Sequence, residues 1–198
     1  MRFAELGQSQ IGVEGLLEDV RTAIESAFAD IETWSPLDRN SNAFWTSRLM
    51  DAMDRLARAT GLDLRRSGGG SGREEFLYDV VFLDTPRSDN PSGYFRPGSH
   101  LKRLVIALEC EWNTSDDEIV YDFTKLLVAR ASLRVFVFWQ RTPVERERIF
   151  QSIEAVIHDF EDGARSDTYL VIGIAGAQCA NVVFDGLGRK TRAPVSAR

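Results

Sequence analysis

Apolar residues recur at steps of three and four along the first third of the chain, which is the spacing of an amphipathic helix. One such stripe runs from Ile11 to Ile31, and a second runs from Phe44 to Ala57 before Gly61 stops it. The pattern therefore predicts an N-terminal helix over about 11–33 and a second helix that opens the core at about 44.

The middle of the chain changes to short apolar runs, which predict strands over 62–66, 75–83, 103–112 and 133–139. A glycine-rich turn at 68–72 separates the first two, and a loop at 85–100 precedes the third. The segment Ser115-Asp116-Asp117-Glu118 has the form of a capping box that opens a helix. A second helix start, with Pro at its first position, follows at Thr142-Pro143-Val144-Glu145, and closing strands are expected over 168–175 and 181–184.

This order of elements predicts an α/β domain with an αβββαβ core, in which helices flank a central mixed sheet. We expect one domain over 1–185, with its core at about 44–139 and a C-terminal helix and strands at about 143–185. Residues 186–198 are rich in basic side chains and are expected to form a disordered tail.

Composition narrows the class of protein. The chain has 198 residues, of which 43% are apolar, enough for a sizeable core. Its apolar runs fall short of the ~18 residues that cross a bilayer, and we see no basic-then-apolar leader, so a cytoplasmic protein without membrane contact is expected. The two cysteines, Cys110 and Cys179, lie in apolar segments and do not support a disulfide scaffold or a cysteine zinc site.

The charge argues against a protein that wraps nucleic acid through a basic surface. The net charge is −6, whereas non-specific affinity for phosphates comes from a basic excess. A metal ion held by central carboxylates would leave the middle segment locally basic, so the charge weakens this class of function without excluding it.

Three carboxylates stand where an apolar sheet would prefer none. Asp79 lies in the apolar run 78–83, and Glu109 and Glu111 end the run that begins at Leu104. Because strand side chains alternate, the two glutamates share one face while Cys110 points to the other. Like charges so close raise each other's pKa, and a divalent cation is the simplest partner that removes this penalty. Lys125, on the following helix, lies beside the buried stripe and is positioned to lean toward the strand ends.

At these residues the sequence resembles the PD-(D/E)XK nuclease superfamily, over roughly 44–139. The resemblance implies a restriction-endonuclease-like fold in which Asp79, Glu109 and the backbone carbonyl of Cys110 hold Mg²⁺ or Mn²⁺. Glu111 replaces the lysine of the family pattern and would hold a second ion or the attacking water, and Lys125 resembles a lysine that has migrated to the next helix. The implied activity is metal-dependent hydrolysis of phosphodiester bonds, with DNA favoured over RNA.

Other interpretations of the same residues remain open. Asp79 could be satisfied by a backbone group or by an arginine, for example Arg65, Arg66 or Arg103. Glu109 and Glu111 could line a solvated sheet face, and Lys125 could be a solvated helix lysine. His100 and His158 have no nucleophile at a suggestive spacing, and Trp112 fits a core position. Basic and aromatic residues of the loop could grip a nucleic-acid backbone or simply be solvated: Arg87, Tyr94, Phe95, Arg96, Lys102 and Arg103.

The alternative function is therefore a nuclease-like fold without catalysis, which serves as a nucleic-acid-binding or protein-interaction module. A further possibility is a homodimer or a partner subunit that supplies the contacts to nucleic acid.

Overall fold

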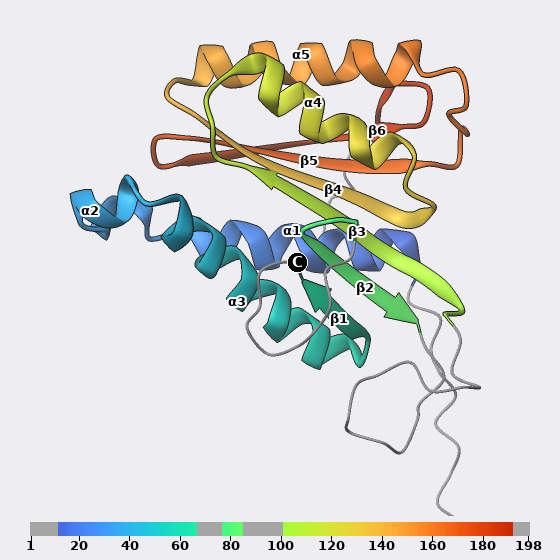
Figure 1. Cartoon of the computed structure of the whole chain (residues 1–198), viewed down its shortest axis with the longest axis horizontal. Coiled ribbons are helices and arrows are strands. Elements are labelled where there is room, and N and C mark those ends of the chain that lie inside the picture. Colours follow the sequence, from blue (N-terminus) through green and yellow to red (C-terminus); the bar gives the residue numbers. More distant parts are fainter. Residues whose placement is uncertain (1–11, 67–76, 85–100, 192–198) are drawn as a thin grey trace, which may run out of the picture.

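A seven-stranded mixed sheet forms the centre of the molecule, and helices cover both of its faces (Figure 1). The computed structural model describes residues 12–66, 77–84 and 101–191. Helices α1 and α3 lie on one face of the sheet, and α4 and α5 lie on the other. The expected α/β class, with a central mixed sheet between helices, is confirmed.

The N-terminal helices form one cover of the sheet. Helix α1 spans Val13–Phe28 and α3 spans Asn42–Thr60, with a 3-10 turn η1 at Ile31–Thr33 and the short α2 at Pro36–Arg39 between them. The apolar stripe of each helix is buried, as its periodicity predicts. Helix α3 ends at Gly61, whose φ of 69° lies in the left-handed region that glycine adopts without steric cost.

The strands follow one another across the sheet in chain order, from β1 to β7. Strands β3 and β4 run parallel, as do β4 and β5, and every other neighbouring pair is antiparallel. The parallel pairs are joined by α4 and α5, as parallel strands require a crossover. The strand bounds are β1 Asp63–Arg66, β2 Val80–Asp84, β3 Arg103–Glu111, β4 Ala131–Gln140, β5 Thr168–Ala175, β6 Gln178–Asp185 and β7 Lys190–Thr191.

The two crossover helices begin differently. Helix α5 spans Pro143–Asp159 and opens with the expected capping box between Thr142 and Glu145. Helix α4 spans Asp116–Leu127, but the side chain of Ser115 makes no capping hydrogen bond, so the expected box is not formed there. Instead, the side chain of Asn113 accepts a hydrogen bond from the Ser115 N–H at 3.0 Å.

Two apolar clusters fill the space on the two faces of the sheet. The cluster on the α1 and α3 side holds a group of packed aromatic rings. The ring centroid of Trp45 lies 5.4 Å from that of Trp112 and 5.5 Å from that of Phe28. Trp112 is buried and its indole N–H donates to Thr46 Oγ1 at 2.9 Å. Trp112 is therefore a core residue, as its position in the sequence suggested.

Two element boundaries differ from the sequence prediction. Strand β2 begins at Val80, so Asp79 stands just before the strand and not within it. Lys190 and Thr191, placed by the sequence in a disordered tail, pair with β6 as strand β7, and the Lys190 ammonium lies 3.0 Å from Glu154 Oε2. The expected tail is thus wrong for 186–191, while 192–198 lie outside the described residues.

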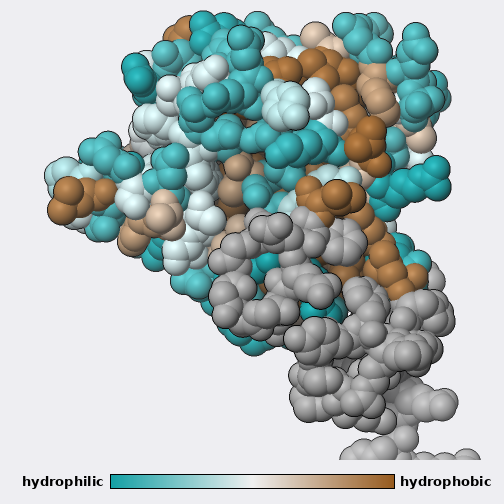
Figure 2. Space-filling view, viewed as in Figure 1, coloured by the Kyte–Doolittle hydropathy of each residue, from teal (hydrophilic) through white to brown (hydrophobic). Residues whose placement is uncertain are grey.

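The surface is mostly hydrophilic on the face shown in Figure 2, with apolar side chains gathered over part of it. Within the described ranges, each helix is too short or too polar to span a membrane. Among the described residues, the large apolar side chains that are exposed are Val13, Leu37, Leu77, Leu101, Tyr121, Val128 and Val144.

Candidate active site

The last three residues of β3 divide between the two faces of the sheet. The carboxylate of Glu109 contacts Lys125 of α4, whereas Cys110 packs with the cluster on the α1 and α3 side. Glu111 follows Glu109 on the α4 face, which agrees with the alternation read from the sequence. Glu109 is only 3% exposed, and a buried carboxylate is costly unless a partner compensates its charge.

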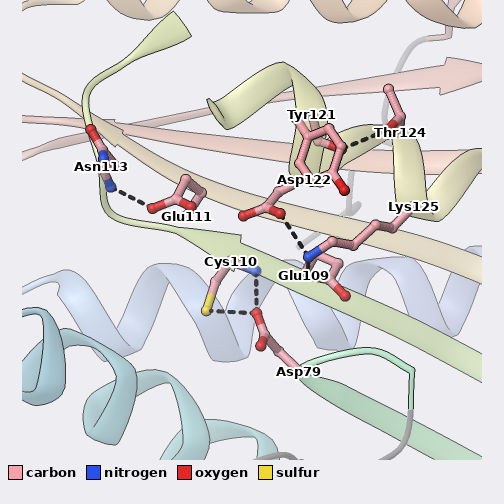
Figure 3. Close-up of polar contacts among 9 residues, drawn as sticks. All are labelled: Asp79, Glu109, Cys110, Glu111, Asn113, Tyr121, Asp122, Thr124 and Lys125. Atoms are coloured by element: carbon pink, nitrogen blue, oxygen red, sulfur yellow. Dashed lines mark hydrogen bonds and ion pairs between the residues drawn. The ribbon is translucent and has the colours of Figure 1, made fainter. Parts of the chain in front are cut away.

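Asp79 reaches the end of β3 through its side chain. Its Oδ2 accepts hydrogen bonds from the Cys110 N–H at 2.9 Å and from the Cys110 thiol at 3.3 Å (Figure 3). The reason lies in the register: the β2–β3 ladder ends at the pair Val80 and Leu108. Beyond this pair β2 supplies no backbone acceptor for the Cys110 amide, and the carboxylate takes that place. One alternative interpretation of Asp79 was that a backbone group satisfies its carboxylate, and the Cys110 N–H is such a group.

The same hydrogen bond fixes the direction of the Cys110 carbonyl. A strand residue directs its N–H and C=O to the same neighbouring strand, as in a hydrogen-bonded antiparallel pair. Because the Cys110 N–H points toward Asp79, its carbonyl oxygen faces the Asp79 side of β3 as well. This direction is compatible with the expectation that the Cys110 carbonyl and Asp79 are ligands of the same metal ion.

Glu109 is held in an electrostatic conflict. Burial, the largest cause, and the nearby charge of Asp79 raise its pKa, the ammonium of Lys125 opposes both, and the net result is a pKa of about 7. The Lys125 Nζ lies 3.3 Å from Glu109 Oε2. This single ammonium does not offset burial and the neighbouring carboxylates, so Glu109 remains much harder to ionise than an ordinary glutamate.

Lys125 does reach the strand ends, as expected from its place on the helix. Its ammonium also lies 2.7 Å from Asp122 Oδ1, one helical turn earlier on α4. Partial burial lowers the pKa of Lys125, but the hydrogen bond to Asp122 and the charge of Glu109 outweigh it and raise the pKa above its ordinary value. Lys125 is therefore a permanent positive charge at the site.

Glu111 shares the site through Asp122. Its Oε1 accepts a hydrogen bond from the Asn113 N–H, and its side chain is also within hydrogen-bonding reach of Asp122. Burial and then the contact with Asp122 raise the pKa of Glu111. Asp122 consequently stands between Glu111 on one side and Lys125 on the other, and Figure 3 shows the three side chains at the junction of β3 and α4.

Asp122 is the residue that the sequence analysis missed. An aspartate three residues before a lysine is typical of a solvated pair on a helix surface, so this spacing gives no reason to single Asp122 out. The signal that could have found it is the position of both residues on one helical turn directly after the strand that ends in Glu109 and Glu111. If Lys125 reaches the end of β3, Asp122 on the same helical turn lies close to that end as well.

The remaining candidates lie elsewhere. Lys102 and Arg103 are exposed at the beginning of β3, the opposite end from the glutamates. His158 is exposed in the last turn of α5, a helix that supplies none of the site side chains. The other loop residues and His100 lie outside the described residues: Arg87, Tyr94, Phe95 and Arg96. Arg65 and Arg66 pair with Asp63 and Asp54.

The donor set has the chemistry of a site for a hard cation. Carboxylate and carbonyl oxygens are the ligands that Mg²⁺ and Mn²⁺ prefer, and a cation would relieve the repulsion that raises the pKa of Glu109. In the arrangement that the structure describes, however, no three acidic, histidine or cysteine side chains of the described residues are grouped closely enough to hold a metal ion. In this arrangement the ammonium of Lys125, and not a metal ion, provides the positive charge beside Glu109.

In comparisons with protein-family models and with curated proteins, nothing matches this chain. The site must therefore be interpreted from its own geometry.

Proposed function

We propose that the chain is a metal-dependent nuclease with a restriction-endonuclease-like core of the PD-(D/E)XK kind. The order α3, β1, β2, β3, α4, β4 supports this core, with an antiparallel β1–β2–β3 unit and a parallel β4. The observation that carries the proposal is the 3.3 Å contact between Lys125 of α4 and Glu109 of β3. In the family pattern the third strand carries a lysine, and here Glu111 occupies that position. Lys125 of the next helix supplies the ammonium beside Glu109 in its place.

Each side chain has a distinct part in this proposal. Asp79, Glu109 and the carbonyl of Cys110 would hold Mg²⁺ or Mn²⁺, and Glu111 would hold a second ion or the attacking water. The cation, when bound, polarises the phosphodiester and lowers the pKa of a bound water. Lys125 would stabilise the negative charge that develops on the phosphate. Since its pKa is raised, Lys125 acts as a fixed charge and not as a proton donor.

The test is cleavage of supercoiled plasmid DNA and of single-stranded RNA in the presence of Mg²⁺ or Mn²⁺. Asp79→Asn and Glu109→Gln keep the size of the side chain, and each is expected to lower the rate by at least roughly 100-fold. Glu118→Gln, which neutralises an exposed carboxylate on α4, is the matched control and should leave the rate unchanged. Equal cleavage by wild type and both site variants would refute the assignment.

A second candidate is a nuclease-like fold that has lost catalysis and binds nucleic acid or protein. The observation that favours it is the pairing of Lys125 with both Glu109 and Asp122, which places a positive charge in the acidic site without a metal ion. Isothermal titration with Mn²⁺ separates the two candidates. The nuclease should bind Mn²⁺ with a heat that Asp79→Asn abolishes, whereas the module should show no heat that depends on Asp79.

A homodimer or a partner subunit would explain how a chain with a net charge of −6 approaches DNA. Light scattering after size-exclusion chromatography, with and without a DNA duplex, measures this directly. A monomer in both samples would rule out the homodimer.

A further inference from the structure

Lys125 is shared unequally between two carboxylates. Its ammonium lies 2.7 Å from Asp122 Oδ1 and 3.3 Å from Glu109 Oε2. The Asp122 side chain is 19% exposed and that of Lys125 is 41% exposed, whereas that of Glu109 is 4% exposed. The shorter contact is thus the one within α4, and the longer contact reaches across to β3.

A lysine needs such a second partner if it is to act at a fixed point. Its ammonium is a compact charge at the end of a flexible four-carbon stem, so one long contact leaves the stem free to move. Glu109 is the more distant of the two partners, since its Oε2 lies 3.3 Å from the ammonium whereas Asp122 Oδ1 lies 2.7 Å from it. The contact with Asp122 does not depend on Glu109.

We propose that Asp122 is a positioning residue, which holds the ammonium of Lys125 at the end of β3 independently of Glu109. This inference rests on the nuclease activity proposed above and assigns a role to a carboxylate outside the expected site. If Glu109 serves as a metal ligand, it is no longer a free partner for Lys125. Asp122 then keeps the positive charge beside the scissile phosphate.

Besides Asp122, the ammonium of Lys125 contacts a third partner, the buried Glu109 of β3. A plain helix-surface pair of aspartate and lysine has no such third partner. This distinguishes Asp122 from Asp117 on the same helix, which is exposed.

The first experiment measures the position of the ammonium without metal or nucleic acid. A ¹H–¹⁵N NMR correlation of lysine ammonium groups detects only those that are held and exchange slowly. We expect a signal that Lys125→Met removes, that persists in Asp117→Asn and that is lost in Asp122→Asn. A signal that survives in Asp122→Asn, or that is absent from the wild type, would overturn the proposal.

The second experiment measures cleavage in a double-mutant cycle. Asp122→Asn should lower kcat by roughly 10- to 100-fold with little change in KM, because it misplaces a group needed in the transition state. In the Lys125→Met background the same substitution should have no further effect, since Asp122 acts through Lys125. Asp122→Glu, which keeps the carboxylate, should restore part of the activity.

An undiminished effect of Asp122→Asn in the Lys125→Met background would contradict the positioning role, because Asp122 would then act independently of the lysine. The two experiments also separate two kinds of failure. Absence of cleavage by the wild type refutes the proposed nuclease, while the NMR experiment still decides whether Asp122 holds Lys125.

Discussion

The raised pKa of Glu109 makes a quantitative prediction about stability. The folded protein holds this carboxyl at a pKa of about 7, against an ordinary value of 4.5. Folded protein therefore keeps a proton on Glu109 over a pH range in which unfolded protein has lost it. By linkage, the stability that depends on Glu109 is full below about pH 4.5, falls as the pH rises toward 7 and is then constant.

The perturbation is Glu109→Gln, which keeps the shape of the protonated glutamate and cannot ionise. A difference of one pH unit between two pKa values corresponds to about 1.4 kcal/mol, so the full effect is about 3 kcal/mol. The variant should match wild type near pH 4 and exceed its free energy of unfolding by this amount at pH 8.5.

Urea unfolding, followed by tryptophan fluorescence in the presence of EDTA, gives both free energies across the pH range. Titrating groups far from Glu109 affect the two proteins alike, so the difference between them reports on Glu109 and its immediate neighbours. Glu118→Gln, at an exposed site, should show no such divergence. Parallel pH profiles for wild type and Glu109→Gln would refute the assignment of an ionisation penalty to this residue.

Three further results are expected. Thr142→Ala removes the capping box of α5 and should lower the free energy of unfolding by about 1 kcal/mol in urea, whereas an unchanged midpoint would show that the cap contributes nothing. Asp167→Asn leaves the buried guanidinium of Arg134 without the carboxylate that lies 3.1 Å away, and should cost about 3 kcal/mol in the same assay, a value well above that of an exposed pair. Binding of Mn²⁺ must displace the proton of Glu109, so its affinity by titration calorimetry should rise about fivefold between pH 6 and pH 7, and a flat profile would place the ion elsewhere.

Most of the helices and strands could be predicted from the periodicity of apolar residues in the sequence. The apolar stripes predicted α1, α3 and α5, and the short apolar runs predicted β3, β4 and β5 with small errors at their ends. These elements are easy to predict because one buried face or a continuous apolar run decides each of them. The alternation of side chains in β3 also placed Glu109 and Glu111 on one face in advance.

The remaining features depend on tertiary contacts. The run that ends at Leu83 does not reveal that β2 begins only at Val80, because the strand pairing with β3 decides that boundary. The Ser115 motif has the letters of a capping box, yet Asn113 makes the local hydrogen bond in its place. Asp122 became visible only when the fold brought its helical turn against the end of β3.

The hydrogen bond from the Cys110 amide to Asp79 also protects an open stretch of backbone. Among the described residues no strand pairs with the β2 side of β3 past Val80, and an unpaired amide there would be a template for a strand of another molecule. A charged carboxylate on that amide blocks such self-association. Asp79→Ala would remove this block together with the proposed ligand, so Asp79→Asn, which retains an acceptor oxygen, is the substitution that tests chemistry apart from aggregation.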